Sequence, residues 1–160
     1  MKKLLPAILL LGLAACASVS YEEREWARRD AQKLQTIKEM IASRQLPAIE
    51  FESDKAILLP ASYETLNKIA QILIDNRTLK LVVEGHCDDV GSDDYNDALS
   101  YARAKAVKTY LTDRGVWPDY VKIYGYGERK PLVRSTTEEA RALNRRVEFR
   151  LTTRNWQAIF

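Results

Sequence analysis

A loop between a predicted strand and a predicted helix carries the residues best suited to bind a polar ligand. The loop spans residues 85–91, reads Gly-His-Cys-Asp-Asp-Val-Gly and contains Asp88. In α/β sheets, ligands usually bind where the carboxyl ends of strands run into loops. Asn96 and Arg103 follow in the helix, and seven helical steps return to within about 20° of the starting direction. The two side chains therefore share one stripe of the helix, with Asn96 in the first turn, close to Asp88.

Arg145 has an unusual place beside the last predicted strand. It has the same parity as the apolar residues of the segment 147–151, so it is expected to point to the apolar face of the sheet. An unpaired guanidinium there would be strongly disfavoured, so Arg145 needs a carboxylate or a ligand. A purely structural salt bridge between Arg103 or Arg145 and the Asp88-Asp89 pair is the alternative to a binding site.

Cysteine–histidine catalysis is disfavoured at this loop. His86 and Cys87 are adjacent, and neighbouring residues of an extended segment point to opposite faces, so His86 cannot orient the thiol. His86 is the single histidine of the chain, so no other imidazole could take its place. We therefore expect no enzyme. We expect His86, level with Glu84 on the polar face of its strand, to be a structural hydrogen-bonding residue rather than a ligand.

Composition and charge exclude several other classes of protein. The 160 residues are 46% hydrophobic and 29% charged, with only 6 Gly and 5 Pro, which fits one globular domain with a short appendage. The formal charge is +3 and falls to +1 without residues 1–15, so nothing favours a nucleic-acid partner. One His and two Cys are too few for a structural zinc site built from such ligands alone, and we expect neither a metal nor another cofactor.

The first sixteen residues have the layout of a bacterial export signal. Lys2 and Lys3 precede an apolar run over residues 4–13, which is too short for a permanent membrane span. The junction Leu-Ala-Ala-Cys that ends at Cys16 resembles a lipobox. That resemblance implies a signal peptide over residues 1–15, cleavage before Cys16, and diacylglycerol and a further acyl chain such as palmitate on Cys16. A plain secretory signal that is cut elsewhere is the alternative.

The residue after the cysteine sets the expected location. Ala17 stands where an Asp would resemble an inner-membrane retention signal, so we expect a lipid anchor in the bacterial outer membrane, with the protein on its periplasmic face. A lipidated Cys16 also leaves Cys87 without an intramolecular partner, so we expect no disulfide.

Residues 16–45 are expected to comprise the lipidated cysteine and a helical tether. The segment 21–44 contains no Gly or Pro and carries a thin apolar stripe among many charges. Ala27, Leu34 and Ile41 lie seven apart, a repeat that is too short to establish a coiled coil. A solvated helix that leans on the domain is favoured over a dimer seam, and it would reach about 36 Å at 1.5 Å per residue.

The rest of the chain, residues 46–160, alternates strands with helices. Apolar spacing, Pro60, the cap candidates Ser92 and Asp93, and the Thr-Thr-Glu-Glu segment 136–139 set the expected boundaries. Strands are expected over about 49–53, 79–85, 121–126 and 147–151, and helices over about 60–74, 95–114 and 137–144. The strands have one apolar and one polar face. This predicts an α/β two-layer sandwich, with a mixed four-stranded sheet covered by helices on one face.

Several separated motifs give this domain a family resemblance. They are Gly85-His-Cys-Asp88, Asn96-x-x-Leu-Ser-x-x-Arg103-Ala, Gly125-x-Gly-x-x-x-Pro131 and Asn144-Arg-Arg-Val-Glu148, in this order. Through these motifs the segment 46–153 resembles the OmpA-like C-terminal domain, the peptidoglycan-associated module of Pal lipoproteins and of the MotB stator protein. With the lipobox, the whole chain resembles a Pal-like outer-membrane lipoprotein.

The resemblance implies noncovalent binding of peptidoglycan through the diaminopimelate of its stem peptide. Asp88, in the Asp position of the family's Gly-His-Thr-Asp motif, would bind the ammonium group. Arg103 would hold the carboxylate through its planar guanidinium fork. The pocket would be completed by Asn96, Arg145 and backbone groups near Val90 and Gly91.

Two positions depart from the family pattern. Cys87 replaces the usual Thr, which removes a hydroxyl group beside the pocket, and Ala140 stands where the family often has Gly. Neither change touches the two charged anchors. The function implied is that of a lipoprotein that anchors the envelope to peptidoglycan. A Pal-type interaction protein, whose main role is to bind a periplasmic Tol-like partner, is the alternative.

Overall fold

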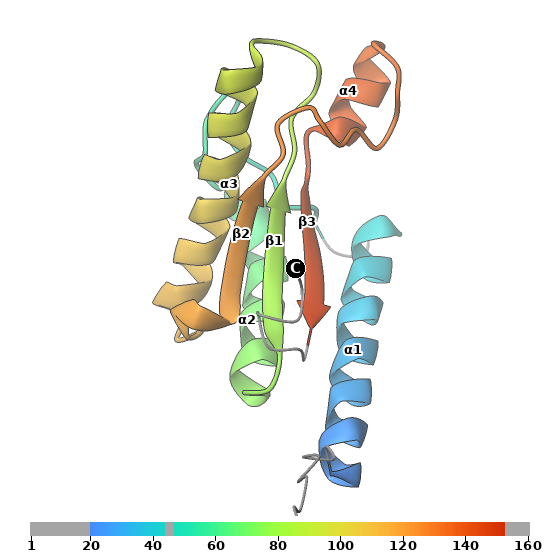
Figure 1. The fold of residues 1–160 in the computed structure, drawn as a ribbon, viewed down its shortest axis with the longest axis vertical. Coiled ribbons are helices and arrows are strands. Elements are labelled where there is room, and N and C mark those ends of the chain that lie inside the picture. Colours follow the sequence, from blue (N-terminus) through green and yellow to red (C-terminus); the bar gives the residue numbers. More distant parts are fainter. Residues whose placement is uncertain (1–19, 44–46, 153–160) are drawn as a thin grey trace, which may run out of the picture.

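The computed structural model describes residues 20–43 and 47–152, which form helices packed on a small sheet (Figure 1). The helices are α1 (Tyr21–Ala42), α2 (Tyr63–Asp75), α3 (Asp93–Asp113) and α4 (Glu138–Asn144). The strands are β1 (Lys80–Gly85), β2 (Val121–Gly125) and β3 (Val147–Thr152), and two short 3₁₀ helices, η1 (Pro60–Ser62) and η2 (Pro118–Tyr120), precede α2 and β2. The predicted signal peptide, Cys16 and residues 153–160 lie outside the described residues.

The sheet is mixed, as the sequence predicts. Its strand order is β2-β1-β3, with β1 parallel to β2 and antiparallel to β3. Gly85 at the end of β1 pairs with Gly125 of β2 and with Val147 of β3. The carboxyl ends of two strands and the amino end of the third thus meet at one edge of the sheet, and α4 lies beyond this edge (Figure 1).

The predicted count of four strands is wrong for the described part of the chain, where the sheet has three. The segment expected to form the first strand makes only an isolated bridge, between Phe51 and Leu58. Its backbone hydrogen bonds stay local: the amide of Glu52 donates to the carbonyl of Ile57, and the amide of Leu59 donates to the carbonyl of Glu50. Because these groups are paired within their own turn, they are not available to extend the sheet.

The hydrophobic core lies between one face of the sheet and the helices α2 and α3. Alternate residues of the strands point into it, as their parity predicts. The largest fully buried side chains of this core include Leu66, Ile69 and Leu73 of α2, Val107 and Leu111 of α3, and Leu81 and Val83 of β1. The helices therefore cover one face of the sheet, and the molecule is the predicted two-layer α/β sandwich.

Two glycines let α3 approach the sheet edge closely. A Cβ atom on Gly85 would lie 2.1 Å from the carbonyl oxygen of Ser100, and one on Gly125 would lie 2.5 Å from the amide nitrogen of Tyr101. These contacts are with backbone atoms, which cannot move aside cheaply. The two glycines therefore fix how close the N-terminal half of α3 lies to the edge where the loops gather.

The helix α1 begins at a capping box and packs on the domain. The side chain of Ser20 accepts a hydrogen bond from the amide of Glu23, whose carboxylate accepts one from the amide of Ser20. The helix contacts α2, and Met40 is partly buried against the core. In this structure the helix therefore packs against the domain. Among the described helices, none is long and apolar enough to cross a membrane.

Candidate functional site

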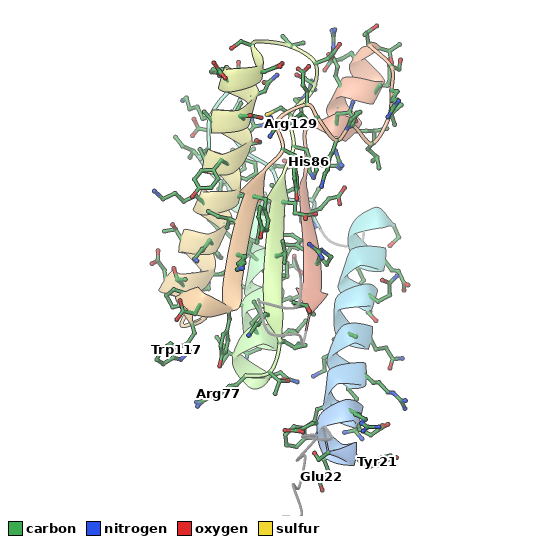
Figure 2. The ribbon with its side chains drawn as sticks, viewed as in Figure 1. Tyr21, Glu22, Arg77, His86, Trp117 and Arg129 are labelled. Atoms are coloured by element: carbon green, nitrogen blue, oxygen red, sulfur yellow. The ribbon has the colours of Figure 1, made fainter. Side chains whose placement is uncertain are left out.

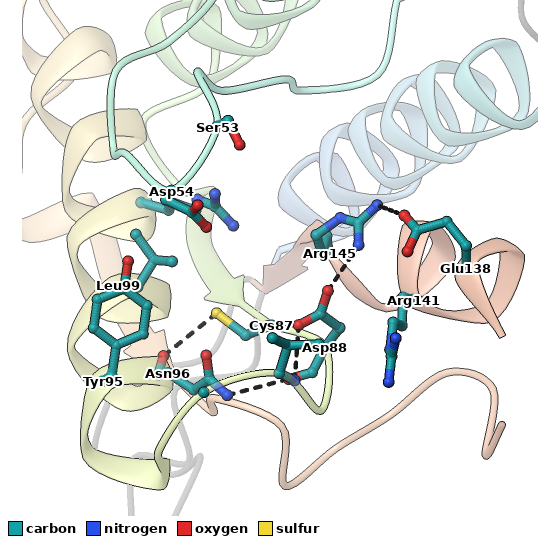
Figure 3. Close-up of a pocket in the computed structure, with 13 residues that line it drawn as sticks. Ser53, Asp54, Cys87, Asp88, Tyr95, Asn96, Leu99, Glu138, Arg141 and Arg145 are labelled. Carbon is teal, nitrogen blue, oxygen red and sulfur yellow. Dashed lines mark hydrogen bonds and ion pairs between the residues drawn. The ribbon is translucent and has the colours of Figure 1, made fainter. Parts of the chain in front are cut away.

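A polar pocket opens at the sheet edge, and the predicted site residues line it (Figure 3). Its volume is about 520 Å³, and its walls come from the turn at residues 53–54, the loop 87–91, the first turns of α3, and α4. Three carboxylates and three guanidinium groups line it: Asp54, Asp88, Glu138, Arg103, Arg141 and Arg145. Asn96, Val90 and Gly91 line it too, so all six predicted ligand-binding residues are brought together.

Asp88 is held by two hydrogen bonds and is almost fully buried. Its Oδ1 atom accepts a hydrogen bond from the backbone amide of Val90 at 3.1 Å, which forms an Asx turn. Its Oδ2 atom accepts one from Arg145 Nη1 at 2.7 Å. These two hydrogen bonds fix the orientation of the carboxylate. Its oxygens still have lone pairs that can accept a hydrogen bond from a further donor.

Asn96 connects the loop to the first turn of α3. Ser92 caps the helix, with its Oγ accepting from the amide of Tyr95, so the predicted cap is confirmed and α3 starts at Asp93. The buried amide of Asn96 donates from Nδ2 to the carbonyl of Asp88 at 3.2 Å and to Glu128 Oε2 at 3.1 Å. Because both donor hydrogens are used in this way, the Oδ1 atom is oriented toward the loop and lies near Gly91.

Arg103 is a buried guanidinium without an acidic partner in the described part of the chain. Only 8% of the residue is exposed. Its Nε donates to the backbone carbonyl of Lys55 at 3.0 Å, and its Cζ atom lies 5.3 Å from the ring centre of Phe51. These contacts hold the side chain in place but neutralise none of its charge. The site therefore presents an oriented cation to whatever enters the pocket.

Arg145 reaches the pocket by a different route from the predicted one. It is not a strand residue that points to the helix-covered face, because it is the C-cap of α4 and β3 begins two residues later. Its guanidinium bridges Asp88 Oδ2, at 2.7 Å, and Glu138 Oε1, at 2.6 Å. Hydrogen bonds to Asp88 and then to Glu138 raise the pKa of Arg145 above its ordinary value. The salt bridge that the sequence offered as an alternative is thus present, inside the pocket.

Two further charged residues of the pocket, Glu138 and Arg141 of α4, were not predicted from the sequence. Arg141 donates from Nε to Asp89 Oδ1 at 2.7 Å, and this hydrogen bond lowers the pKa of Asp89 and raises that of Arg141. Glu138, Arg141 and Arg145 recur at helical spacing, which places their side chains on one face. That spacing was the signal that could have found them.

Cys87 and His86 point to different surroundings. The buried Cys87 thiol donates to the carbonyl of Asn96 at 3.4 Å, and burial raises its pKa. His86 does not make the structural hydrogen bonds expected of it: neither ring nitrogen has a hydrogen-bond partner within the described residues, although the side chain is buried. Its ring stacks on Tyr126 with a centroid distance of 5.5 Å. Burial, and next Arg146, lower the pKa of His86.

Known relatives share this domain. The chain is similar to the peptidoglycan-associated lipoprotein of Pseudomonas putida, with 37% identity over 115 residues that cover 72% of this chain and 69% of the relative. It is 42% identical over 100 residues to the peptidoglycan-binding protein ArfA of Mycobacterium tuberculosis, and 39% identical over 100 residues to outer membrane porin F of Pseudomonas fluorescens. These two matches cover 62% of this chain but only 31% of each relative.

Solved structures show the same architecture. The peptidoglycan-associated lipoprotein from Burkholderia pseudomallei superposes with a TM-score of 0.63 at 27% identity, over 66% of this chain and 89% of that one. A putative MotB-like protein from Desulfovibrio vulgaris superposes with a TM-score of 0.66 at 25% identity, over 82% of this chain and 98% of that one. The OmpA family model matches residues 50–145, which include the whole loop 85–91 and every residue that lines the pocket. The chain belongs to the OmpA family.

Proposed function

We propose that this protein binds peptidoglycan noncovalently, through the zwitterionic end of a diaminopimelate side chain in the stem peptide. The observation that carries the proposal is that two charged groups line the same pocket. One is the buried guanidinium of Arg103, which has no acidic partner among the described residues, and the other is the oriented carboxylate of Asp88. A ligand that fits must offer an anion to the first and a cation to the second. The names of two relatives, a peptidoglycan-associated lipoprotein and the peptidoglycan-binding protein ArfA, point to the same ligand class.

Arg103 is suited to the carboxylate of such a ligand. Its Nε donates a hydrogen bond to the carbonyl of Lys55, and the Arg103 side chain lines the pocket. The terminal nitrogens of a guanidinium can engage both oxygens of a carboxylate at once. Since the charge is largely desolvated and not neutralised by an acid of the described chain, a bound anion would recover a strong charge-assisted interaction.

Asp88 is suited to the ammonium group. Its two hydrogen-bond donors, the amide of Val90 and Arg145 Nη1, use one lone pair on each oxygen. A carboxylate can accept further hydrogen bonds, so an ammonium can join without displacing either partner. Arg145 would then hold Asp88 in place, and Glu138 would balance the positive charge of Arg145.

We propose binding rather than catalysis at this pocket. The thiol that reaches it, Cys87, has a pKa raised by burial and donates to a backbone carbonyl, so it lacks the thiolate character of a nucleophile. His86 lies beside Glu84 and Glu148 and stacks on Tyr126, so it cannot act as a base for that thiol.

We further propose that acyl groups on Cys16 anchor the chain in the outer membrane, with α1 as the spacer between membrane and wall. The lipobox resemblance and the lipoprotein relatives support this. Replacing Cys16 by Ser is expected to release the protein from the membrane fraction. Mass spectrometry of the mature N-terminus checks the modification, and an unacylated native protein that starts at another residue would contradict it.

The experiment that tests wall binding is co-sedimentation of the purified full chain, in detergent, with purified sacculi. The Asp88→Asn variant should lose about 2–5 kcal/mol of binding free energy, because a charge-assisted partner of a desolvated ammonium is removed. Asp94→Asn is the matched control, since Asp94 is an exposed acid at the start of α3, just after the Asp88 loop, and does not line the pocket. It should bind as the parent protein does.

The same variants distinguish wall binding from a Tol-like partner role. If the principal role is to bind a periplasmic protein through another surface, Asp88→Asn and Arg103→Ala should leave capture of that protein intact. If wall binding is the principal role, loss of sacculus binding should bring the same envelope defect as deletion of the whole protein.

A further inference from the structure

A second cluster of polar side chains lies on the sheet face that α2 and α3 do not cover. Glu84 of β1 pairs in register with Glu148 of β3, and the core residues Val83 and Phe149 flank them with the opposite parity. His86 follows two residues after Glu84, at the carboxyl end of β1 (Figure 2). One ligand atom from each of these three side chains lies within 4.8 Å of the other two.

His86 is the member of this cluster that the protein leaves unsatisfied. The residue is 2% exposed, and both ring nitrogens are buried without a hydrogen-bond partner in the part of the chain that the structure describes. A buried polar group in this state costs the free energy of desolvation and recovers none of it. The ring stacks on Tyr126, and one of its nitrogens lies within 4.8 Å of a carboxylate oxygen of each glutamate.

Each of the two carboxylates has an arginine partner, and Glu84 is the more weakly paired of the two. Like charges directly opposite each other on neighbouring strands destabilise a sheet. Arg146 Nε donates to Glu148 Oε1 at 2.7 Å, but the contact of Arg150 Nη2 with Glu84 Oε1 is long, at 3.4 Å. Both contacts reach the Oε1 atom, and a carboxylate has lone pairs for more than one partner. A cation between the two acids could therefore bind while the arginines remain.

We propose that Glu84, His86 and Glu148 form a binding site for a divalent transition metal ion, with Zn²⁺ as the favoured occupant. An imidazole nitrogen and carboxylate oxygens are common zinc ligands, whereas Mg²⁺ and Ca²⁺ favour oxygen alone. Three protein ligands leave one tetrahedral position for water. The ion would give the His86 nitrogen its missing partner and link β1 to β3.

The chain has too few Cys and His residues for a zinc site built from those ligands alone, but carboxylates can also bind zinc. Cys87 stays apart from this site, because its thiol donates to Asn96 and lines the pocket of Asp88. The new site depends instead on the pairing of Glu84 with Glu148, which are 64 positions apart in the sequence and meet only through the strand register. It is also independent of wall binding, since none of its three residues lines that pocket.

Isothermal titration calorimetry tests this proposal. The full chain carrying Cys16→Ser, in detergent and stripped with EDTA, is titrated with ZnCl₂ and separately with MgCl₂. We expect one Zn²⁺ per chain and much weaker binding of Mg²⁺. His86→Gln and Glu148→Gln should each weaken Zn²⁺ binding by roughly tenfold or more, since even loss of an outer-shell partner costs that much at metal sites.

Two control variants separate this site from other surfaces. Glu139→Gln removes an exposed acid of α4, and Cys87→Ser removes the buried thiol next to His86. Both variants should bind Zn²⁺ as the parent chain does. Circular dichroism establishes that each variant folds. If replacement of the buried His86 prevents folding, the Glu148→Gln variant still tests the site, because Glu148 is partly exposed. Absence of stoichiometric Zn²⁺ binding, binding unchanged by Glu148→Gln in a folded chain, or loss of binding in Cys87→Ser would overturn the proposal.

Discussion

Arg145 donates from Nη1 to Oδ2 of Asp88 at 2.7 Å, although 57 positions separate the two residues. The bridge joins the C-cap of α4 to the loop after β1, and it closes one side of the pocket. The Asp88 side chain is 11% exposed and that of Arg145 is 38% exposed, so the pair is neither a surface ion pair nor a buried one. It makes the carboxylate a fixed anchor rather than a mobile loop side chain.

This bridge predicts that Asp88 and Arg145 are coupled in ligand binding. Arg145→Gln should weaken binding of sacculi, because Asp88 loses the donor that orients it. The double variant Asp88→Asn/Arg145→Gln should lose less binding free energy than the sum of the losses in the two single variants, by about 0.5–3 kcal/mol. A double-mutant cycle on sacculus or stem-peptide affinity measures the coupling. Additive effects would show that Arg145 binds the ligand without acting through Asp88.

The same pair should matter little to the stability of the fold. A partly solvated ion pair contributes about 1 kcal/mol or less. Urea unfolding of Asp88→Asn and Arg145→Gln should therefore show small shifts in midpoint. Collapse of the fold in either variant would instead favour the structural salt bridge as the reason for these residues.

Gly85 should tolerate no side chain. A Cβ at this position would meet the Ser100 carbonyl oxygen at 2.1 Å, so α3 would have to move away from the sheet edge. Gly85→Ala is expected to cost about 1–3 kcal/mol of unfolding free energy or more, as overpacking does elsewhere. The urea midpoint measures this, with Ala98→Ser on the exposed side of α3 as the control. An unchanged midpoint for Gly85→Ala would contradict the close approach.

His86 predicts a dependence of stability on pH in the absence of metal. Its pKa in the folded protein lies below the ordinary value of 6.5, mainly because of burial and then because of Arg146, with Glu148 and Glu84 opposing and Lys130 assisting. The fold therefore favours the neutral ring. At pH values above the ordinary pKa of about 6.5, the neutral His86 ring makes its full contribution to the stability of the fold. This contribution is lost as the pH falls, because the unfolded chain binds the proton at a higher pH than the folded chain does.

Urea unfolding in EDTA between about pH 7.5 and 5.5 checks this prediction, with His86→Gln as the comparison. The parent protein should lose more unfolding free energy across this range than the variant does. Parallel curves for the two proteins would mean that the pKa of His86 is the same in both states.

Much of the fold could be predicted from local sequence. Ser92 and Thr137 both cap helices through their side chains, accepting from the amides of Tyr95 and Ala140, and each lies where a boundary was expected. The parity of β3, with Phe149 buried, followed from period-two spacing. Such features depend on residues that are close in the chain, so a linear pattern contains them.

Features that depend on long-range pairing could not be predicted. The segment around Phe51 has the spacing of a strand, yet its amides are paired within a local turn and the sheet forms without it. Arg145 was placed by strand parity, but the end of α4 decides where its side chain goes. The contact of Arg103 with the carbonyl of Lys55 spans 48 positions and involves a backbone atom, which no side-chain pattern reveals.

Calorimetric titration of two stem peptides into the full chain, in detergent, tests the central claim most directly. One peptide carries diaminopimelate at its third position and the other carries lysine, which shares the amine but lacks the terminal carboxylate. If Arg103 holds that carboxylate, the lysine peptide leaves a buried guanidinium unpaired, at a cost of about 1–3 kcal/mol, and binds roughly tenfold to a hundredfold more weakly. Arg103→Lys should reduce this preference, because an ammonium cannot reproduce the bidentate contact. Equal affinities for the two peptides in the parent protein would contradict the role assigned to Arg103, and with it diaminopimelate as the ligand.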